Sequence, residues 1–168
     1  MRGLTTIAVT VFAASITAAG AASAQQTSDE LAAELGTRID QRSEPSGGNV
    51  EWGRARAVVA APIEQVLEII TDYANYAHFL PHFEKSRILS RRGRNAIVYL
   101  EASIAYGTAT LWAQLRIFAR QPRGDTQIIE GRMLRGNMQR FVARWEVTPV
   151  DRGARSLVDF RILVAPDM

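Results

Sequence analysis

Residues 55–91, ARAVVAAPIEQVLEIITDYANYAHFLPHFEKSRILSR, contain the change of hydrophobic period that decides the fold of this chain. Before Pro62 the pattern is typical of a strand, and we expect one over residues 50–60. Pro62 suits the first position of a helix, and apolar residues after it recur at helical spacing, which predicts a helix over residues 62–72. The chain then continues as a second short helix that Pro81 ends.

Beyond Pro81 the helical period gives way to alternation and turn signals, which predict six antiparallel strands. Alternation separates apolar from charged side chains, as in Phe160 and Ile162 against Asp159. We therefore expect one face of the sheet to cover a core and the other to face water. The strands are expected at residues 83–90, 96–104, 108–120, 126–134, 138–148 and 155–165.

The first 24 residues have the composition of a secretory signal peptide. A basic Arg2 precedes an uncharged apolar run, and Ala22-Ser23-Ala24 fits a cleavage site. The apolar run is shorter than the ~20 residues of a membrane span, so we expect cleavage near Ala24 and no transmembrane span afterwards. The chain has no cysteine, so it uses no disulfide framework. We expect a periplasmic or secreted protein.

Residues 25–49 have a different sequence pattern from residues 50–168, where we expect the folded domain. Leucine and isoleucine side chains at every fourth position predict an amphipathic helix over residues 27–41. The sequence EPSGGN that follows is typical of a flexible linker. We therefore treat residues 25–49 as an N-terminal segment and linker.

Composition argues against a nucleic-acid partner. The 168 residues carry a net charge of +3, and the basic residues are scattered rather than gathered in a stripe. The densest basic group is Arg91, Arg92 and Arg94 around Gly93. We interpret it as a solvated hairpin rather than a phosphate-binding patch.

The two histidines do not predict a metal site. His78 and His82 are four residues apart, but Pro81 between them interrupts any shared helix face, and only Glu84 stands nearby as a third ligand. No nucleophile motif and no phosphate-binding glycine loop is found. We expect no metal and no cofactor, and we interpret both histidines as partly exposed residues at a pocket rim.

Three charged strand residues are weak candidates for acid–base catalysis: Glu101, Glu130 and Arg132. They would have to face a cavity to act on a substrate. Charged side chains are seldom buried without a partner, so the water-facing side of the sheet is the favoured place for them. We therefore assign no catalytic residue.

Aromatic residues are contributed by the helix pair and by several strands. Each of them suits ordinary core packing, but together they also suit a cavity for a flat or long apolar ligand. The residues that we expect to bind such a ligand are Tyr73, Tyr76, Phe79, Trp112, Phe141 and Trp145.

Residues 55–91 resemble the START-like (SRPBCC) superfamily, which includes polyketide cyclase/dehydrase enzymes, birch-pollen-allergen proteins and coenzyme Q-binding proteins. The run Asp-Tyr-x-x-Tyr-x-x-Phe-Leu-Pro is most similar to the coenzyme Q-binding branch. The resemblance implies an α+β helix-grip fold with β-α-α-β6 order and a curved antiparallel sheet. Its matching pieces are Ala61-Pro62, Asp72-Tyr73, Phe79-Leu80-Pro81 and Arg144-Trp145-Glu146.

Members of this fold carry a long C-terminal helix over the concave face of the sheet, whereas the printed sequence stops at Met168. We expect either a truncated product or cover by residues 27–41. The resemblance implies a carrier or chaperone for a lipid or isoprenoid quinone, and the signal peptide predicts that this carrier is exported. We also expect transient contact with a membrane surface. A cyclase/dehydrase enzyme and a protein-interaction domain are the alternatives.

Overall fold

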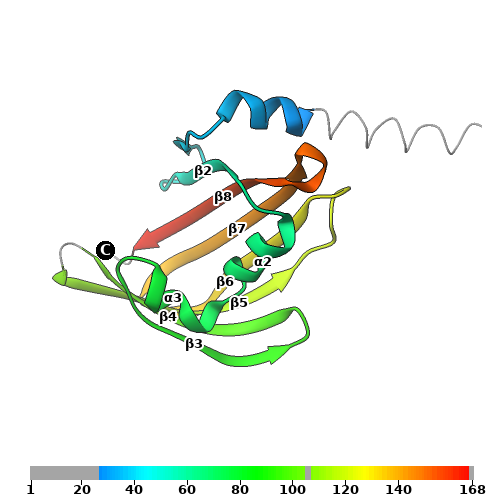
Figure 1. The fold of residues 1–168 in the computed structure, drawn as a ribbon. Coiled ribbons are helices and arrows are strands. Elements are labelled where there is room, and N and C mark those ends of the chain that lie inside the picture. The colour runs from blue at the N-terminus through cyan, green and yellow to red at the C-terminus, as the bar shows by residue number, and fades with distance from the viewer. Residues whose placement is uncertain (1–26, 105–106, 167–168) are drawn as a thin grey trace, which may run out of the picture.

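The computed structural model describes residues 27–104 and 107–166, which form one curved sheet with the short helices of residues 63–79 inside its curve (Figure 1). The predicted signal peptide, residues 1–24, lies outside the described residues. Within the described ranges, no helix is long and apolar enough to cross a membrane. In chain order the elements are β1 (Asp40–Glu44), β2 (Trp52–Val59), α2 (Ile63–Ile70), η1 (Tyr73–Asn75), α3 (Tyr76–Phe79), β3 (Phe83–Arg92), β4 (Asn95–Ile104), β5 (Ala109–Ala119), β6 (Gln127–Gly136), β7 (Met138–Val150), η3 (Asp151–Gly153) and β8 (Arg155–Pro166).

The eight strands of the described residues belong to one antiparallel sheet, in the order β1-β2-β8-β7-β6-β5-β4-β3. The chain crosses from β2 to the opposite edge through α2, η1 and α3, and then returns strand by strand to pair β8 with β2. This arrangement confirms the α+β class, the curved antiparallel sheet and the strand–helix–helix–six-strand order. The six predicted strands correspond to β3–β8.

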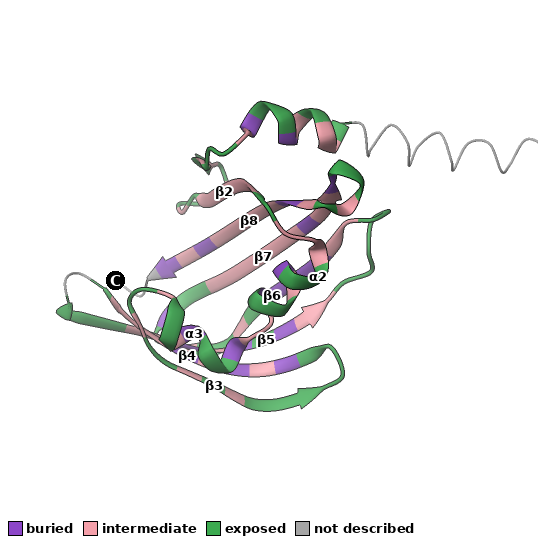
Figure 2. Cartoon of the chain, in the orientation of Figure 1, coloured by how far each residue is buried: buried purple, intermediate pink, exposed green. Residues whose placement is uncertain are grey.

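The helices lie on the concave face because α2 has one apolar side. Val66 and Ile70 of α2 are buried, whereas Ile69 is exposed. Figure 2 shows buried residues concentrated in the middle strands and on the sheet-facing side of α2, while β3 at the edge is largely exposed. The core therefore fills the space between α2 and the strands that it covers.

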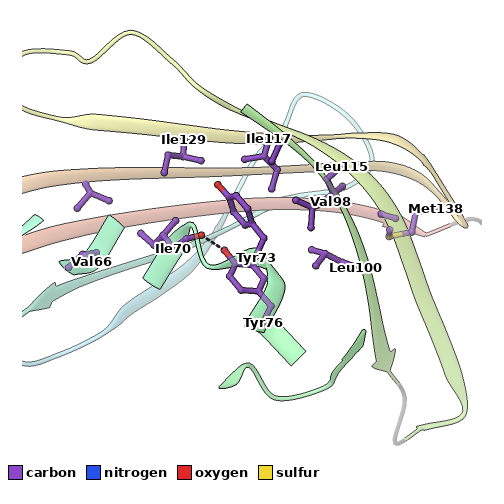
Figure 3. Close-up of a cluster of buried hydrophobic side chains, with 13 residues drawn as sticks. Val66, Ile70, Tyr73, Tyr76, Val98, Leu100, Leu115, Ile117, Ile129 and Met138 are labelled. Atoms are coloured by element: carbon purple, nitrogen blue, oxygen red, sulfur yellow. Dashed lines mark hydrogen bonds between the residues drawn. The ribbon is translucent and has the colours of Figure 1, made fainter. Parts of the chain in front are cut away.

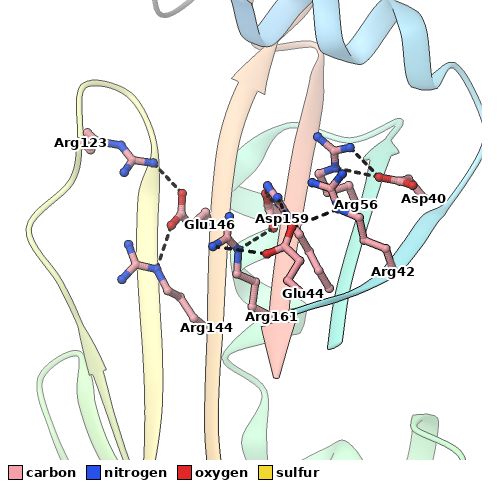
Figure 4. Close-up of polar contacts among 10 residues, drawn as sticks. Asp40, Arg42, Glu44, Arg56, Arg123, Arg144, Glu146, Asp159 and Arg161 are labelled. Atoms are coloured by element: carbon pink, nitrogen blue, oxygen red, sulfur yellow. Dashed lines mark hydrogen bonds and ion pairs between the residues drawn. The ribbon is translucent and has the colours of Figure 1, made fainter. Parts of the chain in front are cut away.

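The N-terminal segment differs from its prediction. Residues 27–35 are helical, but Gly36 follows with a φ of 56°, a conformation that favours glycine and commonly ends helices. The chain then forms β1 instead of more helix, and Asp40 pairs in register with Arg56 of β2. Arg56 also binds the Asp40 carboxylate through its guanidinium, 2.6 Å away (Figure 4).

Residues 27–35, called here the N-terminal helix, pack on the outer face of the sheet. Ala32 and Leu35 are buried against Val150 and Leu157. The concave face of β8 carries the alternate residues, such as Val158. The expectation that residues 27–41 cover the concave face is therefore wrong, because their apolar side is already occupied on the opposite face.

Candidate ligand cavity

An apolar cavity of about 460 Å³ lies between the concave face of the sheet and the η1–α3 corner. None of the residues that line it is charged, and most are aliphatic or aromatic. A cavity of this size and character suits a hydrophobic small molecule. Its lining residues are Tyr73, Tyr76, Leu80, Pro81, Phe83, Leu100, Ala102, Leu111, Trp112, Ala113, Leu115, Ile117, Ile129, Gly131, Met138, Phe141, Ala143, Trp145, Phe160, Ile162 and Val164.

Small side chains at the centre of the sheet create much of this space. Gly131 of β6 pairs with Ala143 of β7, and on its other side it pairs with Ile117 of β5. A Cβ atom added at Gly131 would come no closer than 3.8 Å to Ile117 Cγ1, which is ordinary van der Waals contact. The sheet could therefore carry larger residues here, and glycine leaves the volume empty.

The aromatic corner after α2 closes one side of the cavity. Tyr76 contacts Tyr73, Phe79 and Phe83 edge to face, with ring centroids 5.6–6.2 Å apart. The Tyr76 hydroxyl donates a hydrogen bond to the carbonyl oxygen of Ile70, which ties α3 to the end of α2 (Figure 3). These contacts hold two tyrosine rings against the strands.

Pro81 ends this corner by the mechanism that the sequence predicts. Leu80 takes an extended conformation, with φ −93° and ψ 126°, because a residue before proline avoids helical geometry. Leu80 and Pro81 both line the cavity as the chain enters β3. Asp72 accepts hydrogen bonds from the Asn75 side chain, 2.9 and 3.0 Å long, so it stabilises the turn between the helices.

The structure brings most of the predicted ligand-binding residues together. Tyr73, Tyr76, Phe141 and Trp145 all line the cavity. Phe79 does not line it: this side chain is 45% exposed and lies against the outside of Tyr76.

Trp112 borders the cavity, but its ring is engaged elsewhere. The indole stacks on Tyr99, with centroids 6.1 Å apart. Tyr99 alternates with the inward-facing Val98 and Leu100, so this stack lies on the outer face. A ligand in the cavity therefore meets the β5 strand at Trp112 rather than the face of its indole ring.

Several lining residues were absent from the predicted set. On β8, Phe160, Ile162 and Val164 face the cavity, and Phe160 stacks on Trp145 with centroids 4.0 Å apart. Gly131 has no side chain to contact a ligand and instead leaves space for it. The alternation of β8 predicted which of its residues face inward, but aromatic character alone did not identify a glycine as part of a site.

The three weak catalytic candidates lie on the outer face. Glu101 binds Lys85, 2.8 Å away, and this hydrogen bond together with one from Tyr99 lowers the pKa of its carboxyl. Neither Glu101 nor Glu130 nor Arg132 lines the cavity. Acid–base chemistry inside the cavity would therefore need other groups.

Glu130 is nevertheless buried beneath arginines. It is 3% exposed and accepts a hydrogen bond from Arg120 that is 2.7 Å long, while Arg132 and Arg144 complete the cluster. Burial acts to raise the pKa of Glu130, but the hydrogen bonds from Arg120 and Arg132 outweigh it, and the net pKa is lowered. Glu130 is therefore ionised at neutral pH, as expected for a structural ion pair.

A second depression of about 720 Å³ lies on the outer face and is polar. Its glutamates bind arginines of the same wall: Glu146 binds Arg144 at 2.8 Å and Arg123 at 2.6 Å (Figure 4). This outer depression is larger than the concave cavity, but its charged wall does not suit an apolar ligand.

The histidines have no catalytic surroundings. Both His78 and His82 are exposed, and the backbone carbonyl of His82 accepts a hydrogen bond from Ser103. Among the described residues, no group of three or more His, Cys, Asp or Glu side chains is arranged to hold a metal ion.

A curved antiparallel sheet closed by a helix pair around an apolar cavity is the helix-grip fold. The sequence agrees: residues 59–168 match the family described as polyketide cyclase / dehydrase and lipid transport. The chain belongs to this family. A search of curated proteins found no match.

Solved structures with the same fold come from several bacteria. A STAR-related lipid transfer protein from Xanthomonas axonopodis superposes with a TM-score of 0.64, at 16% identity over 76% of each chain. A START superfamily protein from Mycobacterium smegmatis has a TM-score of 0.60, at 18% identity over 70% of this chain and 78% of that one. The Zhui aromatase/cyclase from Streptomyces sp. R1128 has a TM-score of 0.59, at 19% identity over 71% of this chain and 70% of that one. At these identities the likeness concerns the fold.

Proposed function

We propose that this protein binds a hydrophobic small molecule in the concave cavity and acts as its carrier or chaperone. One observation carries the proposal: the cavity has about 460 Å³ of space and no charged residue in its wall. Transfer of apolar ligand surface from water into such a space contributes about 25 cal/mol per Å². An uncharged wall favours retention of a ligand over acid–base chemistry on it.

The ligand class that we propose is a lipid or an isoprenoid quinone. The resemblance of residues 72–81 to coenzyme Q-binding proteins supports it, as does the lipid-transport description of the family. The aromatic rings of Trp145 and Phe160, stacked on the wall, suit a flat ring system.

Extraction of the protein purified from its native source, followed by mass spectrometry, tests this proposal. We expect a co-purifying apolar molecule at a substantial fraction of one per protein. A protein that emerges empty, and that also fails to take up added lipid or quinone, would argue against carriage. Conversion of an added polyketide-like substrate would support the cyclase alternative instead.

We also propose that the carrier acts after export. Support comes from the signal-peptide pattern of residues 1–24. The mass of the protein isolated from its native cells tests this directly. A chain that begins at Gln25 in the periplasmic or extracellular fraction is expected, and an intact Met1 in the cytoplasm would contradict export.

A further inference from the structure

The cavity wall is almost entirely apolar, so its few polar side-chain groups determine which polar ligand atoms can enter. The candidates for such a group are the hydroxyls of Tyr73 and Tyr76 and the indole nitrogens of Trp112 and Trp145. Trp112 is stacked on the outer face, and Trp145 is half-buried in its stack with Phe160. The two tyrosines come from the helix corner and are both buried.

The two tyrosine hydroxyls differ in their partners. The Tyr76 hydroxyl donates to the backbone oxygen of Ile70. The Tyr73 hydroxyl makes no hydrogen bond to the described part of the chain, although the side chain is only 4% exposed. Figure 3 shows it directed away from Tyr76, toward Ile117 and Ile129 on the strands.

An unsatisfied hydroxyl among aliphatic side chains carries a cost in stability. Among the described residues, every side-chain nitrogen or oxygen atom that is fully buried has a hydrogen-bond partner. The Tyr73 hydroxyl therefore faces open space, where a ligand or a water molecule can reach it. Burial raises the pKa of Tyr73 to about 12, so the group keeps its proton at neutral pH and is able to donate.

We propose that the Tyr73 hydroxyl donates a hydrogen bond to a carbonyl-type oxygen of the bound ligand. The cavity would then select an apolar molecule with one such oxygen, as in a ketone, ester or quinone, and orient that oxygen toward β5 and β6. This inference rests on the proposed function, because it concerns the same cavity. Donation to water is the competing role, since Tyr73 also borders a smaller hollow of about 260 Å³ that Glu68 and Arg91 line.

A pair of probes of equal shape tests this proposal. The probes are 2-acetonaphthone and 2-isopropenylnaphthalene, in which a methylene group replaces the carbonyl oxygen. Their affinities are measured for the full chain, freed of bound lipid, and for the variants Tyr73→Phe and Tyr99→Phe. We expect Tyr73→Phe to weaken binding of the ketone about three- to tenfold and to leave binding of the alkene unchanged.

Tyr99→Phe is the matched control because the Tyr99 hydroxyl donates to Glu101, 2.7 Å away, on the outer face of the sheet and not in the cavity. It should leave the ketone-to-alkene ratio of affinities as in the wild type. The carbonyl stretch of bound acetonaphthone adds a second readout: it should lie at lower frequency in the wild type than in Tyr73→Phe.

An unchanged affinity ratio and an unshifted carbonyl stretch in Tyr73→Phe, with both probes still bound, would overturn the role of Tyr73. That result would leave the carrier function standing and assign the hydroxyl to water. Failure of both probes to bind the wild type, together with an empty native extract, would instead remove the proposed function and this inference with it.

Discussion

Gly136 at the end of β6 shows how closely two strands approach in this sheet. A Cβ atom placed there would lie 2.5 Å from the backbone oxygen of Trp112 and 2.8 Å from the sulfur of Met133. The backbone contact cannot be relieved by a rotamer change. Glycine is therefore required here by close approach rather than by an unusual φ angle.

Replacement of this glycine tests the close approach. We expect Gly136→Ala to lower the free energy of unfolding by about 1–3 kcal/mol, because β5 and β6 must separate to admit the methyl group. Urea denaturation measures the change. Gly131→Ala is the control in the same strand: its Cβ meets only ordinary contacts, so stability should be unchanged or rise by up to about 1 kcal/mol. Equal stabilities for both variants would contradict the packing at Gly136.

At the scale of elements, the N-terminal helix belongs to the outer face and not to the cavity. Its Leu35 is 7% exposed against Leu157 and Val150. We expect Leu35→Ala to cost about 2–3 kcal/mol in unfolding free energy and to leave ligand affinity unchanged. Denaturation and a binding titration on the same variant separate the two effects. A loss of affinity without a loss of stability would contradict this placement and indicate that the helix covers the cavity.

The edge strand β1 is held by ion pairs whose strength depends on pH. A hydrogen bond from Arg56 lowers the pKa of Asp40, and one from Arg54 lowers the pKa of Glu44. Groups with a lowered folded pKa contribute stability above their unfolded values of 3.8 and 4.5, and that contribution is lost as pH falls through the folded pKa.

Amide hydrogen exchange in β1, followed as pH is lowered from neutral to below 4, tests this dependence. After correction for the intrinsic exchange rate, protection should fall first in β1 and later in the central strands. Asp40→Asn should show reduced protection of β1 already at neutral pH. Protection that stays constant across this range would contradict a role for the ion pairs.

At the scale of the whole molecule, periodicity predicted most of the fold. The switch at Pro62 from alternation to helical spacing, and back after Pro81, predicted the helix pair and its place before β3–β8. Strand faces also followed alternation, because a half-buried antiparallel strand must separate apolar from charged residues. In β5 the alternation of the sequence puts Trp112 on the face opposite the lining residues Leu111 and Ala113, so alternation is a better guide here than aromatic character.

Long-range partners were beyond this kind of prediction. The segment 40–44 has no hydrophobic pattern of its own, and it forms a strand by pairing with the backbone of β2, where Arg54 and Arg56 also bind its acids. The cavity itself follows from Gly131 next to Ala143, a match between strands that no local pattern contains. Which tyrosine hydroxyl remains unpaired likewise depends on the tertiary position of the Ile70 carbonyl.

The central claim is that the space above Gly131 holds the ligand. Gly131→Leu fills that space from the middle of the sheet, whereas Arg116→Leu adds the same side chain to the exposed outer face of β5. The decisive measurement is the amount of ligand extracted per protein from each variant and from the wild type, with melting temperatures recorded in parallel. We predict a folded Gly131→Leu protein with little or no ligand beside a fully loaded Arg116→Leu protein. Wild-type loading of Gly131→Leu would contradict the cavity as the binding site.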